Sequence, residues 1–457
     1  MDEFFSHENS SFPPALTVHG HLRTSDSKSE LLYCLTSDNI ITISQSDDNM
    51  SMPSSTCIIF DGAVMVHLNS PAGIMTYSQY VNHVFIRKIK SFAQNATRID
   101  VVFDQYHQHS LKATARAKRG QSAVRRVSPD VLTPRDWKEF LRNECNKTSL
   151  FQLIASTLVE NIVIHDKEIY TTNGPGVLSN GQMTNAIFPC SLEEADSRML
   201  LHAFDAARKG HTSILLRSVD TDVIIVAVAL FHELNVDHLW VAHGSGRHFK
   251  YIPIHQIANA MGPSAGVALL FFHAFTGCDT VSAFHGIGKK TAWATWKALP
   301  HMTSTFLALS SRPQEVTDDN FKNLERFVIA MYDKGCSSVH INDARKALFC
   351  QKGRPIERIP PTAGTLQQHI HRAAYQAGHV WYCSLSIHVE LPSPLMWGWR
   401  MDSGRIEPLW TVYPEVSKAC KELIRCCCKK GCSKSRCKCL RSGLPCTDLC
   451  KCGGCQM

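Results

Sequence analysis

The sequence of 457 residues lacks long apolar runs, basic residues at its N-terminus and any net charge over most of its length. Its longest apolar run, Val223 to Phe231, has about half the length that a membrane-spanning helix needs. No basic residue occurs in the first six positions, so we expect no secretory signal peptide. With 44% hydrophobic and 19% charged residues, the composition predicts a folded globular protein of several domains and no membrane partner.

Basic charge and cysteine are both concentrated in the segment from Lys418 to Met457. This segment holds ten of the 48 basic residues and two of the 40 acidic residues, so it carries the whole net charge of +8. It also holds 11 of the 19 cysteines, and the other eight are scattered singly. The pattern is untypical of a secreted disulfide protein and predicts a reducing compartment with one metal site. A short basic tail on a neutral body predicts binding to a polyanion.

Short β-branched runs alternate with longer helical patterns, which predicts an α/β fold with a mostly parallel sheet. We divide the chain into a partly ordered leader at 1–56, a core at 57–300, a helical and Pro/Trp-rich region at 301–417 and the tail at 418–457. The leader is expected to hold one helix or strand near residues 31–35. In the core, strands are expected at 57–60, 99–103, 214–219, 223–228 and 238–242, and helices at 77–93, 134–160, 192–208 and 255–275.

Carboxylates follow several of the predicted strands. Because ligands of an open parallel sheet bind beyond the carboxyl ends of its strands, these acids are expected to share one crevice. Each acid alone also fits a turn or a helix cap, and Ser191 to Glu194 fits a capping box. A cluster of like charges is unfavourable unless cations bind, and oxygen ligands favour two Mg²⁺ or Mn²⁺ ions. The candidate ligands are Asp61, Asp104, Glu194, Asp196, Asp220, Asp222 and Asp279.

Two further features fit a phosphodiester substrate. The first is a basic helical stretch after Asp104, which fits either phosphate contacts or a solvated helix face; it contains Lys112, Arg116, Lys118, Arg119, Arg125 and Arg126. The second is the turn Gly286-Ile-Gly288-Lys289-Lys290 between two predicted helices at about 270–298. Backbone N–H groups in such a turn can meet a phosphate at a helix N-terminus.

In the order and local spacing of these motifs, residues 57–300 resemble the flap-endonuclease family of structure-specific 5′ nucleases, which have a PIN-like core. The resemblance implies that the seven acids bind two metal ions and that Lys112 and Arg119 contact the scissile phosphate. It also implies a DNA-binding helix-two-turn-helix around Gly286, Gly288, Lys289 and Lys290. His67 stands where the family has a base-stacking tyrosine, and the long N-terminal segment also departs from the family pattern.

The tail has the cysteine spacing of a zinc cluster, since thiolates one to four residues apart suit tetrahedral zinc. It resembles the tesmin-type CXC domain, which implies about three zinc ions, DNA binding and a groove contact at Arg436, with Lys429 and Lys430 on phosphates. Cys427 is a spare thiol, and His369 and His371 fit surface histidines better than ligands. The nine expected ligands are Cys426, Cys428, Cys432, Cys437, Cys439, Cys446, Cys450, Cys452 and Cys455.

These patterns predict a nuclear, metal-dependent DNA nuclease that a zinc-binding tail brings to its substrate. The alternative is a non-catalytic chromatin or transcription regulator that uses the nuclease-like core to recognise DNA shape. The complete set of acids favours the nuclease, whereas His67 and the N-terminal extension favour the alternative. The combination of core and tail also resembles animal proteins associated with mobile elements.

Overall fold

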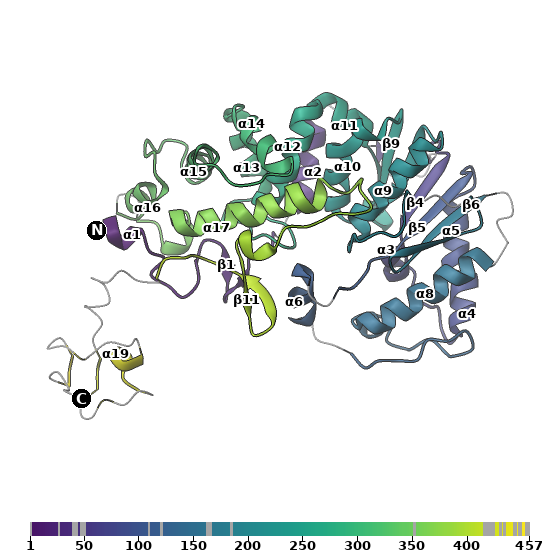
Figure 1. Ribbon diagram of the computed structural model, residues 1–457, viewed down its shortest axis with the longest axis horizontal. Coiled ribbons are helices and arrows are strands. Elements are labelled where there is room, and N and C mark those ends of the chain that lie inside the picture. The colour runs from purple at the N-terminus through teal and green to yellow at the C-terminus, as the bar shows by residue number, and fades with distance from the viewer. Residues whose placement is uncertain are drawn as a thin grey trace.

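A mixed sheet lies toward one end of the molecule, on the right in Figure 1, as the computed structural model shows. The strands in sheet order are β3 (Ser44–Gln45), β10 (Lys250–Pro253), β9 (His238–His243), β8 (Ser213–Arg217), β4 (Cys57–Asp61), β5 (Arg98–Val102), β6 (Glu168–Asn173) and β7 (Gly176–Ser179). The five strands from β9 to β6 pair in parallel, and the edge strands pair antiparallel. The predicted α/β class with a mostly parallel sheet is confirmed.

The structure describes most of the chain before the tail and only isolated parts of the tail. The described residues are 2–25, 28–38, 44–45, 52–107, 110–118, 122–160, 167–182, 186–350, 353–414, 426–428, 432, 436–441, 446 and 450–452.

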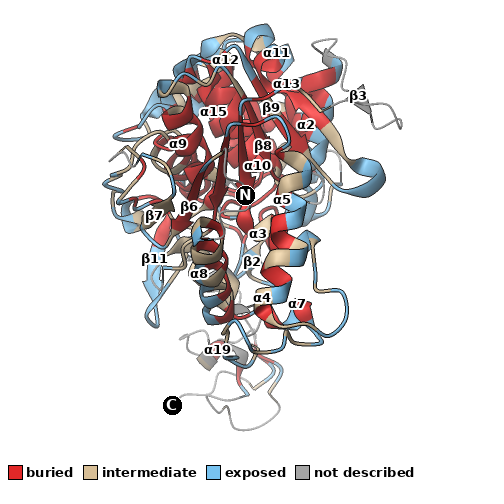
Figure 2. Cartoon of the chain, turned by 90° about the vertical axis from the view of Figure 1, so that its right-hand side faces the viewer, coloured by how far each residue is buried: buried red, intermediate tan, exposed pale blue. Residues whose placement is uncertain are grey.

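Helices cover both faces of the sheet because successive strand side chains point to opposite sides. Ile58 and Phe60 of β4 face one layer, while Cys57 and Ile59 face the other. Figure 2 shows β8 and β9 buried together with helices of the second layer. The first layer contains α3 (Gly62–Leu68), α4 (Tyr77–Tyr80), the π-helix η1 (Val81–Ile86), α5 (Arg87–Phe92), α7 (Trp137–Phe140) and α8 (Glu144–Glu160); the second contains α2 (Lys28–Asp38), α9 (Ala195–Arg208), α10 (Thr221–Leu234), α11 (Ile254–Met261) and α12 (Pro263–Phe275).

Four predicted strands lie close to their expected positions, but the strand predicted at 223–228 is wrong. Those residues belong to α10, which is buried on nearly all sides. An apolar run of β-branched residues has no periodicity that separates a buried helix from a buried strand. The helix predicted at 255–275 is two helices, because Gly262 adopts a positive φ of 78° between α11 and α12. The sequence interpretation also missed the β6–β7 hairpin and β10.

The region after residue 300 extends the same hydrophobic core that α12 shares with the sheet. Within the described residues, no single helix has the length and apolar character to cross a membrane; α11 and α12 meet that test only as a pair, and they are bent by 104°. The helix α13 (Lys289–Ala298) precedes this region. The elements of the region include α14 (Met302–Ser310), α15 (Asp318–Tyr332), α16 (Ile341–Cys350), α17 (Ala363–Ala374), the π-helix η4 (Tyr375–Trp381) and the hairpin of β11 (Trp399–Asp402) and β12 (Arg405–Pro408).

Buried arginines fasten both ends of the described core. Arg345 of α16 donates to the backbone oxygen of Phe5 at 3.1 Å, which holds α1 (Asp2–Phe5) in place. Arg372 of α17 donates to the backbone oxygens of Gly398 and Leu409 at 2.9 and 2.7 Å. These two carbonyls flank the β11–β12 hairpin, so the guanidinium fixes both ends of it. These hydrogen bonds to carbonyl oxygens offset part of the cost of burying the cation, although Nε and Nη2 of Arg372 have no hydrogen-bond partner among the described residues.

We expect Gly398→Ala to lower the free energy of unfolding by more than Gly404→Ala, which serves as the matched control. Both glycines have a positive φ, 81° and 78°, and alanine there costs about 1–2 kcal/mol. At Gly398 an added Cβ would also lie 2.5 Å from the backbone oxygen of Gln368, whereas the space around Gly404 is open. Crowding of this kind adds about 1–3 kcal/mol. Thermal unfolding of both variants measures the difference, and equal effects would contradict the close packing.

Candidate active site and cysteine cluster

Strand-end acids meet at one edge of the sheet. Asp61 is the last residue of β4, and Asp104 and Asp220 follow the adjacent strands β5 and β8. Because these strands are parallel, their carboxyl ends share one edge. A cavity of about 450 Å³ at this edge is lined by Asp61, Asp104, Glu194, Asp196 and Asp220, and also by His67, Lys112 and Lys147. Five of the seven predicted metal ligands therefore line one cavity.

The remaining two acids lie beside the same cavity. The carboxylate oxygens of Asp220, Asp222 and Asp279 lie within 4.8 Å of one another, which is close enough to share one ion. Glu194 and Asp196 enter the site at the first turn of α9, where the N–H of Ala195 donates to Asp104 Oδ1 at 2.8 Å. The structure thus brings all seven predicted acids to one end of the sheet.

The helix-cap interpretation holds for two of these acids and fails for a third. Asp61 accepts a hydrogen bond from the N–H of Val64 at 2.9 Å, and Asp220 accepts from the N–H of Asp222 at 2.9 Å. Each of these acids thus caps a helix with one oxygen, and the other oxygen of Asp61 accepts from the Ser218 hydroxyl at 3.4 Å. Glu194 makes no cap hydrogen bond, and α9 begins at Ala195, so the predicted capping box is wrong. Its carboxylate instead pairs with Lys112 Nζ at 2.9 Å.

The electrostatics of the site favour a bound cation. Burial raises the pKa of Asp61 to about 7, and the charges of Asp104 and Asp220 act in the same direction. Burial also raises the pKa of Asp196 well above its usual value, with a further contribution from Asp220. Although burial lowers the pKa of the Lys112 ammonium, the carboxylates of Glu194 and Asp196 raise it well above its ordinary value. Ionised carboxylates crowded in this way are relieved when a divalent cation binds between them.

The donor chemistry of the acid cluster fits Mg²⁺ or Mn²⁺. All seven candidate ligands are carboxylates, and hard divalent cations take oxygen ligands. A thiolate-binding ion such as zinc would find no sulfur among them. The cluster therefore fits a hard divalent cation by ligand type and by proximity.

The predicted DNA-contacting residues have different outcomes. Gly286 and Gly288 are exposed in the turn before α13, and Lys290 is exposed at the second residue of α13. The prediction that Lys289 contacts DNA is corrected, because its side chain is buried and points away from solvent. His67 is exposed on α3 and lines the acid cavity. Arg119 lies outside the described residues, and its role stays a prediction.

The sequence interpretation missed an aromatic side chain with cations on it. Tyr106 lies two residues beyond Asp104; Lys147 Nζ is 4.1 Å from its ring centre and the Arg116 guanidinium is 5.4 Å from it. These three residues line a second cavity of about 480 Å³ together with Asp104, Glu194 and Asp279. The β11–β12 hairpin lines it too, through Trp399, Ile406, Glu407 and Pro408. Only the position of Tyr106 next to a strand-end acid was a usable sequence signal.

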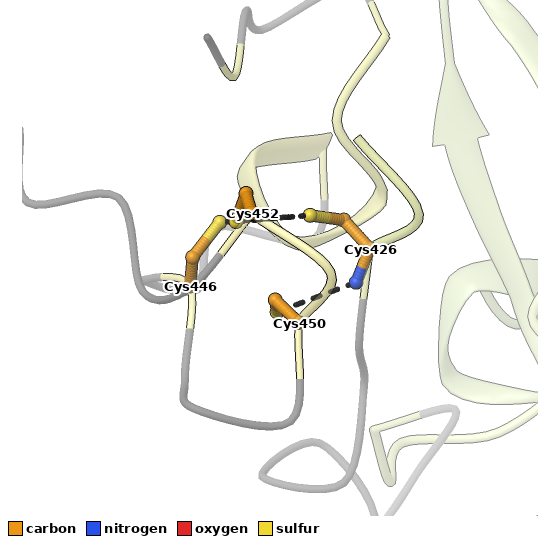
Figure 3. A group of neighbouring side chains, drawn as sticks. All are labelled: Cys426, Cys446, Cys450 and Cys452. Carbon is orange, nitrogen blue, oxygen red and sulfur yellow. Dashed lines mark hydrogen bonds between the residues drawn. The ribbon is translucent and has the colours of Figure 1, made fainter. Parts of the chain in front are cut away.

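Eight of the nine described cysteines of the tail form one tight cluster. Three groups of four have sulfur atoms within 4.8 Å of one another, and Cys426 belongs to all three. Figure 3 shows one group, in which the Cys426 and Cys452 sulfurs lie 3.5 Å apart and the N–H of Cys426 points to Cys450 Sγ at 3.3 Å. The groups are Cys426, Cys446, Cys450 and Cys452; Cys426, Cys428, Cys432 and Cys437; and Cys426, Cys437, Cys439 and Cys446. A sulfur atom that belongs to two groups could bridge two tetrahedrally coordinated ions.

The other residues singled out in and near the tail are partly described. Arg436 is exposed and so is Cys427, which belongs to none of the three groups. Cys455, Lys429 and Lys430 lie outside the described residues. His369 was expected at the surface and is instead buried, with Nε2 2.8 Å from the backbone oxygen of Phe275.

No family model matches the sequence, and no curated protein matches it. Similar folds occur among solved structures. One is a T5 protein crystallised with metal ions, with a TM-score of 0.34, 12% identity and coverage of 70% of this chain and 96% of that chain. A bacteriophage T5 flap endonuclease variant with DNA and metal ions has a TM-score of 0.33, 12% identity and coverage of 72% and 97%. A T5 5′-exonuclease variant has a TM-score of 0.31, 13% identity and coverage of 72% and 96%.

We expect Mg²⁺ to stabilise the protein more at pH 8 than at pH 5. Folding raises the pKa of Asp61 to about 7. The free energy of unfolding therefore falls as pH rises from the pKa of Asp61 in the unfolded chain through about 7, because the folded state must release the proton. A cation bound among the ionised carboxylates offsets that loss, by about 2.7 kcal/mol at a hundredfold excess over its Kd. Thermal unfolding with and without Mg²⁺ at both pH values measures this stabilisation.

The control for this measurement is Asp220→Asn. Asparagine caps a helix as well as aspartate does, so α10 keeps its first turn while the site loses one charged ligand. The variant should fold and should lose most of the Mg²⁺ effect. An undiminished Mg²⁺ effect in Asp220→Asn would place the ion elsewhere.

We expect the full-length protein to bind about three zinc ions in native mass spectrometry, since four-coordinate sites that share thiolates need fewer sulfurs than separate sites. Cys426→Ser should lose more than one ion because Cys426 belongs to three groups. Cys427→Ser, changed at the adjacent and exposed thiol, should keep the full complement. Equal zinc loss in the two variants would contradict the grouping.

Proposed function

We propose that the protein is a divalent-metal-dependent nuclease of flap-endonuclease type, with a PIN-like core that hydrolyses phosphodiester bonds in DNA. The observation that carries this proposal is the set of seven carboxylates at the carboxyl edge of the parallel sheet. The family resemblance of the sequence assigns these same residues to metal binding. The helix pair α12 and α13 with its exposed Gly286 would be the helix-two-turn-helix that meets duplex phosphates.

Two divalent cations held by the carboxylates would supply the Lewis acid and activate water for attack on phosphorus. The residues of the chain position these groups. Asp61 and Asp220 are fixed by their cap hydrogen bonds, and Asp104 is fixed by the N–H of Ala195. The Lys112 ammonium pairs with Glu194 in the structure. On substrate binding it would turn to the scissile phosphate and neutralise the charge that develops there. Arg119 would assist it.

The second cavity supports the proposal that an unpaired DNA strand binds beside the acids. Its volume of about 480 Å³ suits a small ligand such as a single nucleotide and is too small for a duplex. Tyr106 would offer a ring for base stacking, and Lys147 beside it would offer charge to the adjacent phosphates. Arg116 is paired with Glu144 and Glu193 and would hold this wall of the cavity in place. Aromatic platforms with cations beside them are typical of single-strand binding sites. We therefore propose that the duplex lies outside and one strand enters.

The tail would act as a zinc-dependent DNA-binding module of tesmin CXC type. Its basic residues, Lys429 and Lys430 among them, would contact phosphates, and the exposed Arg436 would enter a groove. About three zinc ions would hold it together, because so short a segment has little apolar surface to bury. A nuclear location fits a DNA substrate and reduced thiols.

The alternative is a non-catalytic DNA-binding regulator that uses the core to read DNA shape. His67, which lines the acid cavity in place of a stacking tyrosine, is the observation that favours it. Cleavage assays separate the two functions directly, since both predict DNA binding.

We expect Asp104→Ala and Asp222→Ala each to abolish Mg²⁺-dependent cleavage of branched DNA while leaving DNA binding nearly intact. Loss of a metal ligand removes activation of water and stabilisation of charge together, a loss of several kcal/mol or more than about a thousandfold in rate. Single-turnover cleavage of branched and linear substrates measures the rate. The exposed Asp319 of α15 provides the control, and Asp319→Ala should cleave normally. Wild-type rates in Asp222→Ala would rule out this mechanism.

A further inference from the structure

A line of three buried polar side chains leads away from the acid cluster into the core. Asp222 on α10, His273 on α12 and Lys289 at the start of α13 are 3%, 0% and 1% exposed. His273 Nε2 lies 2.9 Å from Asp222 Oδ1, and Lys289 Nζ lies 3.1 Å from His273 Nδ1. Three helices thus contribute one side chain each to a chain of hydrogen bonds that ends on a candidate metal ligand.

The partners assign the tautomer of His273. A lysine ammonium only donates hydrogen bonds, so Nδ1 of the imidazole accepts. Nε2 then carries the proton and donates a hydrogen bond to the Asp222 carboxylate. The neutral imidazole therefore passes the influence of the Lys289 charge to Asp222, and its N–H occupies one carboxylate oxygen and fixes the orientation of the other.

Further contacts hold Lys289 and His273 in this hydrogen-bonded relay, which runs from Asp222 through His273 to Lys289. Lys289 Nζ also donates to the backbone oxygen of His273 at 2.6 Å and to Thr276 Oγ1 at 2.8 Å. The His273 ring is stacked on Trp381 of η4, with ring centres 5.6 Å apart. Trp381 belongs to the region beyond residue 300, so that region helps to fix a residue of the acid site.

The position of Lys289 is unfavourable unless it has a specific partner. A buried ammonium at the first residue of a helix faces both the loss of hydration and the positive end of the helix dipole. The adjacent Lys290 on the same turn is exposed and avoids both. The acceptors around Lys289 offset these costs and direct its charge toward Asp222.

We propose that Lys289 and His273 are positioning residues that orient the Asp222 carboxylate for a divalent cation. The inference deepens the proposed function, because it concerns the same acid cluster. Hydrogen-bond partners that fix a metal-binding carboxylate commonly contribute 10- to 100-fold to metal affinity or activity. Lys289 would therefore act on the metal site from the interior, although Gly288 and Lys290 on either side of it are exposed.

The experiment measures Mn²⁺ affinity of the full-length protein by electron paramagnetic resonance, and DNA affinity and cleavage in parallel. Lys289→Met should weaken Mn²⁺ binding about 10- to 100-fold and leave DNA affinity unchanged. Lys290→Met is the matched control and should weaken DNA binding while leaving Mn²⁺ affinity unchanged. Wild-type Mn²⁺ affinity in a folded Lys289→Met, or reduced DNA affinity in its place, would overturn the proposal.

A second pair of variants covers the case in which Lys289→Met does not fold. His273→Leu removes the donor to Asp222, whereas His273→Gln retains an N–H near the position of Nε2. The glutamine variant should keep Mn²⁺ affinity within a few-fold of wild type, and the leucine variant should lose it as Lys289→Met does. Equal Mn²⁺ affinity in the two histidine variants would overturn the positioning role.

The same measurements separate this inference from the proposed function. Combining Lys289→Met with Asp222→Asn should weaken Mn²⁺ binding no further than Asp222→Asn alone, because the relay acts through that carboxylate. A wild-type protein that binds Mn²⁺ through Asp222 and cleaves no DNA would overturn the nuclease function and support the relay. Additive losses in the double variant would overturn the relay and leave the nuclease function standing.

Discussion

The repulsion among seven carboxylates at one edge of the sheet is the constraint on which the site depends. Two 14-residue helices, α9 and α10, begin at this edge, and their N-termini place backbone N–H groups next to Asp104 and Asp220. The positive ends of the helix dipoles lower the cost of negative charge there. Lys112 neutralises one carboxylate directly, and Lys289 acts through His273 on another. The parallel topology that gathers the acids thus also supplies part of their compensation.

The parts outside the sheet are joined to this site through packing. Trp381 from η4 is stacked on His273, and β12 packs beside α6 (Leu111–Lys118), the helix that carries Lys112. Arg372 anchors the hairpin to α17, so the wall of the second cavity is fixed to the core. Residues far apart in sequence therefore share one hydrophobic core and one edge of the sheet, so the region beyond residue 300 contributes packing contacts to the acid site.

The acid cluster was predictable from sequence because each acid follows a local pattern, a short β-branched run or a helix start. The fold class followed from the alternation of strands and helices. The strand predicted at 223–228 failed because a fully buried helix and a buried strand have the same apolar composition. The β6–β7 hairpin was missed because its strands carry polar residues such as Thr172 and Asn173 without a clear alternation. Tertiary context decided both cases.

The side chains behind the site were not predictable for a different reason. Lys289 follows a Gly-Ile-Gly turn that has the composition of a phosphate-binding loop, and only the course of the chain shows that it turns inward. His273 lies in an apolar helix, where a histidine is as easily a packed core residue as a functional one. Its role depends on Asp222 and Lys289, which are distant in sequence, so no spacing rule connects the three.

The two candidate metal sites differ in the chemistry of their ligands, so they would favour different ions. The sheet edge offers only carboxylates, which suit hard cations, whereas the tail offers thiolates, which suit zinc. The acid site is built by a folded sheet and buried helices, so its geometry exists before an ion binds. The tail has mostly cysteines in its described interior, so ions bound there would contribute much of its folding free energy. Under the proposed function, one chain would combine a preorganised acid site with a cysteine-rich module that its metal ions order.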